Sequence, residues 1–288
     1  MIVARQTAFT MLFVAFWMIV ELLGAHLQRA YSGYQVVWTR YVVHLFFMLA
    51  VWGWRRPMAL LYTRRPVFQI SRSLLMVAMP ASWLIGLSWG VAPQTMMVFL
   101  LLVPLLVLMA ATLCLGEVAS RPNWTVAVVL AVGVGVLAML RNHATVSTLA
   151  FPLMVAVSLA LYIVMTRSLR AESTLANLFY TAFGVAVVLT PVMPVVWIMP
   201  ALHDWLVLVG IGLAGFASLL ALDRATAAAP ASIVGTIFGG LFAASLLIDV
   251  LPVRSFAGVV AAVLLLGALV IACALRWRHR QTDLRGTV

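Results

Sequence analysis

Three ionisable residues stand inside long apolar stretches of the sequence: Glu21, Arg40 and His44. Burying a charge in hydrocarbon costs roughly 2.5 to 3.5 kcal/mol on insertion scales, so such residues are candidates for function. At about 1.5 Å per helical residue, Glu21 and Arg40 reach similar depths on two consecutive helices. They could form a fixed ion pair that only neutralises both charges, or they could bind a solute or take part in gating.

His44 lies one helical turn beyond Arg40 and on the same helix face. An imidazole can bind and release a proton near neutral pH, so His44 is a candidate for coupling a proton to another process. The alternative is a hydrogen-bonded histidine that only packs between helices.

Aromatic side chains supply a second kind of candidate. Trp17, Trp83 and Tyr162 fall in the middle of apolar stretches, whereas the other tryptophans fall near their ends. A cavity for an apolar or aromatic solute needs aromatic walls and a few polar groups to orient the solute. Trp17, Glu21 and Tyr162 are the preferred wall, although each could instead pack helix on helix. Polar residues that could assist are Ser82, Gln94, Ser158, Ser218, Ser232 and Thr236.

Several motifs of enzymes are missing from the sequence. There is no glycine-rich phosphate loop with its lysine, no Cys/His cluster with zinc-ligand spacing and no paired-aspartate motif. We therefore predict no cofactor, no metal and no ATP hydrolysis. An enzyme embedded in the membrane is the second hypothesis, and a structural or channel-forming membrane protein is the third.

The elements that must position these residues are apolar helices. Hydrophobic residues make up 65% of the chain and charged residues 9%, against about half and a quarter in soluble domains. Ten stretches reach the roughly 20 apolar residues that a membrane span needs. The fold class is therefore all-α integral membrane with ten transmembrane helices, at about 7–27, 35–53, 68–89, 93–115, 122–140, 149–166, 174–198, 204–222, 230–249 and 253–275.

The net charge of +11 does not indicate a nucleic-acid partner, because the arginines fall between apolar runs instead of along one exposed face. If the N-terminus is cytoplasmic, most of the 18 basic residues collect on the cytoplasmic side. The positive-inside rule then predicts that both termini are cytoplasmic. The residues left for the other side are Arg29, Arg40, Arg141 and Arg254.

The two halves of the chain share short similarities. The segment 91–95 (VAPQT) recurs as 228–232 (AAPAS), and 115–118 (LGEV) can be set against 247–250 (LIDV). Five helices per half is an odd number, so the repeats must be inverted in the membrane. This predicts a first repeat at 1–140, a second at 141–280 and a cytoplasmic tail at 281–288. Chance matching of common residues is the alternative.

The sequence resembles the drug/metabolite transporter superfamily, in its EamA-type branch of ten-helix carriers, from Thr7 to about Leu275. The resemblance is carried by the fourth-helix pattern from Pro93 through Pro104 to 115–117 (LGE), echoed by 229–232 (APAS). The second copy differs, with 248–249 (ID) where Gly-Glu is usual. Within the branch the chain is most similar to YddG-type exporters of aromatic amino acids.

The resemblance implies a secondary transporter in a bacterial inner membrane that exports small amphipathic metabolites by alternating access. Aromatic or hydrophobic amino acids are the favoured solutes, with organic cations or nucleotide precursors as alternatives. The expected partners are this small-molecule substrate and the lipid bilayer, with a coupled proton as an option. The sequence leaves solute identity, direction of transport and oligomeric state open.

Overall fold

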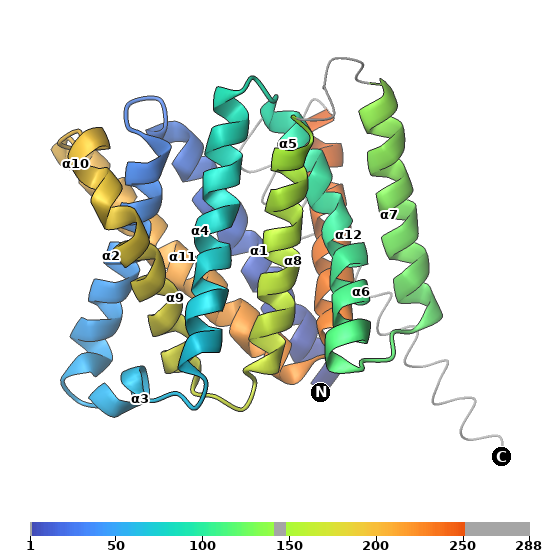
Figure 1. The fold of residues 1–288 in the computed structure, drawn as a ribbon, viewed down its shortest axis with the longest axis horizontal. Helices are drawn as coiled ribbons and strands as arrows, with labels where there is room; N and C mark the ends of the chain where they lie inside the picture. The colour runs from blue at the N-terminus through green and yellow to red at the C-terminus, as the bar shows by residue number, and fades with distance from the viewer. Residues whose placement is uncertain (1, 141–147, 251–288) are drawn as a thin grey trace.

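The computed structural model describes residues 2–140 and 148–250 of the 288-residue chain. The described residues form helices and connecting turns, with no strand among them, and the helices run side by side as a bundle (Figure 1). Seven of the described helical stretches are long and apolar enough to cross a membrane. The expectation of an all-helical, multi-pass membrane protein is confirmed.

Nine of the predicted stretches overlap helices among the described residues, and the tenth, 253–275, lies outside them, as does the 281–288 tail. The first half contains α1 (Ile2–Leu27), α2 (Gly33–Met48), α3 (Pro57–Leu61), α4 (Pro66–Ser88), α5 (Pro93–Phe99), α6 (Val103–Leu115) and α7 (Arg121–Leu140). The second half contains α8 (Ala150–Ser168), α9 (Thr174–Leu189), α10 (Met193–Val196), α11 (Leu202–Ala228) and α12 (Ala231–Val250).

Prolines set several helix starts and breaks. Pro57, Pro66 and Pro93 each open a helix, where a missing N–H leaves no hydrogen bond unmade. The predicted span at 93–115 is divided into α5 and α6 by a 3-10 turn at Leu100–Leu102. Pro104 cannot donate to the carbonyl four residues earlier, so the regular α-helical pattern is interrupted there.

The helices pair across the two halves of the chain. α1 packs along α11, and α8 packs along α4. α2 also contacts α11, and α9 also contacts α4, while α2 and α9 contact each other. α6 contacts α8 and α12, and α7 stands at the edge of the bundle (Figure 1).

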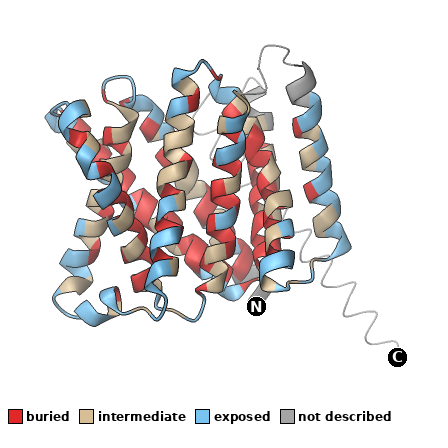
Figure 2. Cartoon of the chain, in the orientation of Figure 1, coloured by how far each residue is buried: buried red, intermediate tan, exposed pale blue. Residues whose placement is uncertain are grey.

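Large apolar side chains cover much of the outer surface of the bundle. Figure 2 shows buried residues concentrated between the helices and exposed residues on their outward faces. Phe46, Val67 and Leu113 are between 72% and 80% exposed. An apolar surface this extensive is unfavourable in water and suits contact with lipid tails.

The two ends of the bundle are named after short helices that mark them. The α3 side carries α3 and the start of α1, and the α10 side carries α10 and the loop between α1 and α2 (Figure 1). Under the predicted topology the α3 side is cytoplasmic.

Candidate functional site

A cavity lies between α1, α2, α4, α5, α8 and α11, with about 690 Å³ of empty space including the part open to the outside. We call it the wide chamber. Its lining includes Gln28 from the exposed loop between α1 and α2, so the wide chamber reaches the α10 side. Its walls are mostly apolar, from Val20 on α1 to Ile211 on α11.

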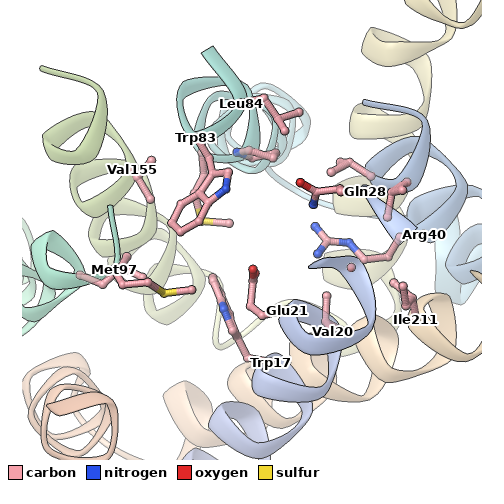
Figure 3. Close-up of a pocket in the computed structure, with 16 residues that line it drawn as sticks. Trp17, Val20, Glu21, Gln28, Arg40, Trp83, Leu84, Met97, Val155 and Ile211 are labelled. Carbon is pink, nitrogen blue, oxygen red and sulfur yellow. The ribbon is translucent and has the colours of Figure 1, made fainter. Parts of the chain in front are cut away.

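Four of the residues singled out in the sequence line the wide chamber: Trp17, Glu21, Arg40 and Trp83. Figure 3 shows the two tryptophans on different walls, with the Glu21 carboxylate and the Arg40 guanidinium directed into the space between the walls. A cavity with two aromatic walls and one charge of each sign can hold an apolar group and orient polar ones.

The expected direct ion pair between Glu21 and Arg40 is not present. Among the described residues, the ion pairs within 4.0 Å join Glu117 to Arg167 and Asp204 to His203. The Arg40 guanidinium instead lies over the Tyr41 ring, 4.7 Å from its centroid. Depth along the helices placed Glu21 and Arg40 at one level. Both side chains line the wide chamber, but they do not form an ion pair across it.

A smaller space, the deep chamber, adjoins the wide chamber and has about 380 Å³ of empty space. Four lining residues are common to both chambers: Trp17, Val20, Arg40 and Met79. The remaining lining residues of the deep chamber are Tyr41, His44, Met76, Gly215, Ser218 and Leu219.

His44 is 1% exposed, and its Nε2 atom has no hydrogen-bond partner. Its ring packs between Tyr41, at 6.3 Å, and Phe216, at 5.0 Å between ring centroids. Ser218, on the opposite wall, donates a 3.2 Å hydrogen bond to the Phe13 carbonyl. The deep chamber thus contains a buried imidazole nitrogen that has no partner among the described residues.

The other candidate residues from the sequence do not line these chambers. Tyr162 is buried away from them, with its hydroxyl 3.2 Å from Thr181 Oγ1, so the preferred wall of Trp17, Glu21 and Tyr162 does not form. Gln94 is exposed at the start of α5. The remaining residues outside both linings are Ser82, Ser158, Ser232 and Thr236.

Sequence reasoning missed a buried polar cluster near the α3 side. Its centre is Arg72 on α4, which is 1% exposed although the arginine distribution counted it only as one of the cytoplasmic-side basic residues. Arg72 donates to Thr166 Oγ1 at 3.1 Å, to Thr181 Oγ1 at 3.0 Å and to the Asn177 carbonyl at 2.5 Å. Its guanidinium also lies 5.1 Å from the centroid of the Tyr162 ring.

The cluster links Arg72 to Asp223 through two amides. Arg72 donates to Gln69 at 3.0 Å, Gln69 donates to Asn177 at 2.7 Å, and Asn177 donates to Asp223 at 2.8 Å. Thr174 donates to the second carboxylate oxygen of Asp223 at 2.7 Å. A signal was available, because Arg72 and Asp223 both lie several residues inside helical stretches, on α4 and α11.

A second polar contact joins helix ends on the same side of the bundle. Arg167 at the end of α8 pairs with Glu117 at 3.1 Å and donates to the Thr226 carbonyl at 2.7 Å. Together with the buried cluster, this contact ties the α3-side ends of α4, α6, α8, α9 and α11 to one another. The wide chamber reaches the α10 side, while buried polar contacts hold the α3-side ends together.

One face of α4 runs past all of these features. Trp83, Met79, Met76 and Arg72 are spaced by three or four residues and so share a helix face. Trp83 lines the wide chamber, Met79 lines both chambers and Met76 lines the deep chamber. Arg72 lies in the polar cluster. This face marks a continuous line from the α10 side toward the α3 side.

Comparison with known proteins gives partial similarity. No family model matches the chain. It is 32% identical over 169 residues to S-adenosylmethionine uptake transporters of Rickettsia conorii and of Rickettsia prowazekii, an alignment that covers 57% of this chain and 56% of each relative. The chain therefore matches little more than half the length of these relatives.

A crystal structure of another protein shares the fold, with a TM-score of 0.68, 16% sequence identity and coverage of 94% of this chain and 98% of the other. The molecule is thus an all-helical, multi-pass membrane protein with an established fold. Over more than half of its length it is similar to proteins named as transporters of a small metabolite.

Proposed function

We propose that this protein is a secondary transporter of a small metabolite that carries a carboxylate, a cationic group and an aromatic or other apolar portion. The observation that carries the proposal is that Glu21 and Arg40, which form no ion pair with each other, face one chamber between Trp17 and Trp83.

Unpaired charges inside a membrane protein are costly unless water or a ligand of opposite charge meets them. A solute with both charges can satisfy Glu21 and Arg40 at once. The planar guanidinium of Arg40 suits a carboxylate, and the Glu21 carboxylate suits an ammonium or a sulfonium. The faces of Trp17 and Trp83 suit an aromatic ring or a cation.

S-adenosylmethionine and the aromatic amino acids both belong to this chemical class. The relatives are named S-adenosylmethionine uptake transporters, which favours S-adenosylmethionine as the solute and favours uptake over the export expected from the sequence. S-adenosylmethionine carries a carboxylate, an ammonium, a sulfonium and a purine ring, so it offers a partner to Trp17, Glu21, Arg40 and Trp83 in the wide chamber.

Helix pairing supports the two inverted five-helix repeats. If α8, α9 and α11 are the counterparts of α1, α2 and α4, the α1–α11 contact corresponds to the α8–α4 contact. Likewise the α2–α11 contact corresponds to the α9–α4 contact. Repeats related in this way have two exchangeable arrangements, and the exchange would open the α3 side by separating the buried polar cluster. The proposal also places the protein in a bacterial inner membrane, with both termini in the cytoplasm.

The test is flux into liposomes that contain the purified protein, with radiolabelled S-adenosylmethionine and radiolabelled tryptophan in parallel assays. We expect saturable flux of unaltered solute, and a decrease of about tenfold or more in kcat/KM for E21Q and for R40Q. The matched control is R29Q, because Arg29 is exposed on the loop after α1 and lines neither chamber. An imposed pH gradient tests a proton as the coupling ion.

Three results would oppose the proposal. Absence of saturable flux for both solutes would reject the solute class. Equal effects of R40Q and R29Q would reject the wide chamber as the binding site. Recovery of a chemically altered solute would favour the membrane-embedded enzyme.

A further inference from the structure

We propose that the deep chamber binds the carboxylate of the solute and that His44 Nε2 is its second donor, beside the Arg40 guanidinium. This inference rests on the proposed function and adds the orientation of the solute. The polar head points into the deep chamber, and the aromatic portion stays between Trp17 and Trp83.

The first observation is the unpartnered His44 Nε2 atom, on a side chain that is 1% exposed. A buried donor or acceptor without a partner costs about 1 to 3 kcal/mol, so a group from outside the chain is expected to meet it. The ring cannot turn away without losing its packing on Tyr41 and Phe216. In the tautomer that carries its proton on Nε2, the imidazole donates into the deep chamber.

The second observation is the position of Arg40 between the two chambers. His44 follows Arg40 by one helical turn, so both side chains leave α2 on the same face. Gly215 on α11 makes room for Arg40, because a Cβ atom there would lie 3.1 Å from Arg40 Cδ. Arg40 can therefore present its guanidinium to a group that His44 also reaches, and two donors converge on one small space.

No carboxylate side chain lines the deep chamber, whereas Arg40 and His44 can both donate hydrogen bonds there, so an anionic group is favoured. The carboxylate of Glu21 lines only the wide chamber and is left for the cationic part of the solute. The smaller volume of the deep chamber suits a head group and not the whole metabolite.

The test compares S-adenosylmethionine with its decarboxylated analogue as inhibitors of flux, in wild-type protein and in H44F, H44N and H44Q. H44F keeps an aromatic ring between Tyr41 and Phe216 but has no Nε2 donor. We expect H44F to weaken inhibition by S-adenosylmethionine about tenfold and to leave the analogue unchanged. H44N, whose amide is too short to reach the Nε2 position, should behave like H44F. H44Q should recover part of the affinity, because its amide nitrogen can approach that position.

The control is F47L. Phe47 packs on Phe216, 5.1 Å between ring centroids, but lines neither chamber. F47L should affect both inhibitors equally or not at all. If H44F fails to fold, H44N gives the same comparison.

If H44F weakens inhibition by both compounds equally, His44 is a packing residue. If H44F changes inhibition by neither compound, His44 does not contact the carboxylate. Either result overturns the inference and leaves the proposed function intact. A wild-type protein that neither compound inhibits, and that carries neither solute, would instead reject the proposed function itself.

Discussion

Arg72 illustrates how burial changes the role of a residue. Arg64 and Arg65 at the same end of the bundle are exposed, whereas the Arg72 side chain is enclosed by α4, α8 and α9. The two terminal nitrogens of the Arg72 guanidinium donate to side chains and to a backbone carbonyl, whereas its Nε atom has no partner among the described residues. A buried cation with several acceptors holds its neighbours in fixed positions.

We predict that R72M lowers the stability of the detergent-solubilised protein by at least about 2 kcal/mol, because it leaves several buried acceptors without a donor. R72K should also destabilise, since an ammonium cannot reproduce the fork of contacts. Thermal unfolding monitored by circular dichroism measures the change. The control R65M, at an exposed arginine, should change little, and equal effects of R65M and R72M would contradict the cluster's structural role.

The hydrogen bond of Tyr31 leads to a prediction about how the stability of the protein depends on pH. Its hydroxyl donates a 2.6 Å hydrogen bond to Asp204 at the α10 side, and this bond raises the pKa of Tyr31 above its ordinary value. A raised pKa in the folded state means that the hydrogen bond stabilises fully below about pH 10 and is lost as the pH rises through the folded-state value.

Y31F should therefore lower the unfolding temperature near neutral pH, and the difference from wild type should shrink above about pH 10. Unfolding scans of both proteins at neutral pH and above pH 10 measure it. If the difference in unfolding temperature between Y31F and wild type stays constant across this range, the Tyr31 hydroxyl does not stabilise the protein through its hydrogen bond to Asp204.

At the scale of elements, the packing of α2 against α11 depends on glycine. A Cβ atom at Gly212 would lie 2.5 Å from Val43 Cβ and 3.2 Å from the Arg40 carbonyl oxygen. Distances this short force α11 away from α2, and α2 carries Arg40 and His44. The chamber geometry is therefore tied to a helix contact that only a residue without a side chain permits.

We predict that G212A destabilises the protein by about 1 to 3 kcal/mol through overpacking. Gly210 is the matched control, because a Cβ atom there would meet nothing within 4 Å. G210A should be neutral or slightly stabilising, since alanine favours the helix more than glycine does. Thermal unfolding separates the two variants, and equal stabilities would show that α2 and α11 can shift apart without cost.

At the scale of the whole molecule, orientation in the membrane is open to a direct test. In a protein with its native cysteines replaced by serine, we place single cysteines at Arg29 on the α10 side and at Arg64 on the α3 side. The arginine distribution predicts that an impermeant thiol reagent labels the first from outside intact cells and the second only after lysis. Reversed labelling would invert the assignment of both sides and of both termini.

The apolar stretches determined by themselves that the chain forms a bundle of membrane helices, because hydrogen bonding within a helix and contact with lipid are local requirements. The sequence also singled out Trp17, Glu21, Arg40 and Trp83 as candidates, and all four line the wide chamber. Position along a helix gives depth directly, at about 1.5 Å per residue, and these four share a depth range.

Tertiary structure decided which way the side chains point. Tyr162 has a suitable depth but faces Arg72 and Thr181, and Glu21 and Arg40 face a chamber instead of pairing. These outcomes depend on contacts such as that of α1 with α11, whose residues are far apart in the chain. Rotation of a helix about its axis is set by the partners it packs against, and no local pattern in an almost uniformly apolar helix specifies those partners.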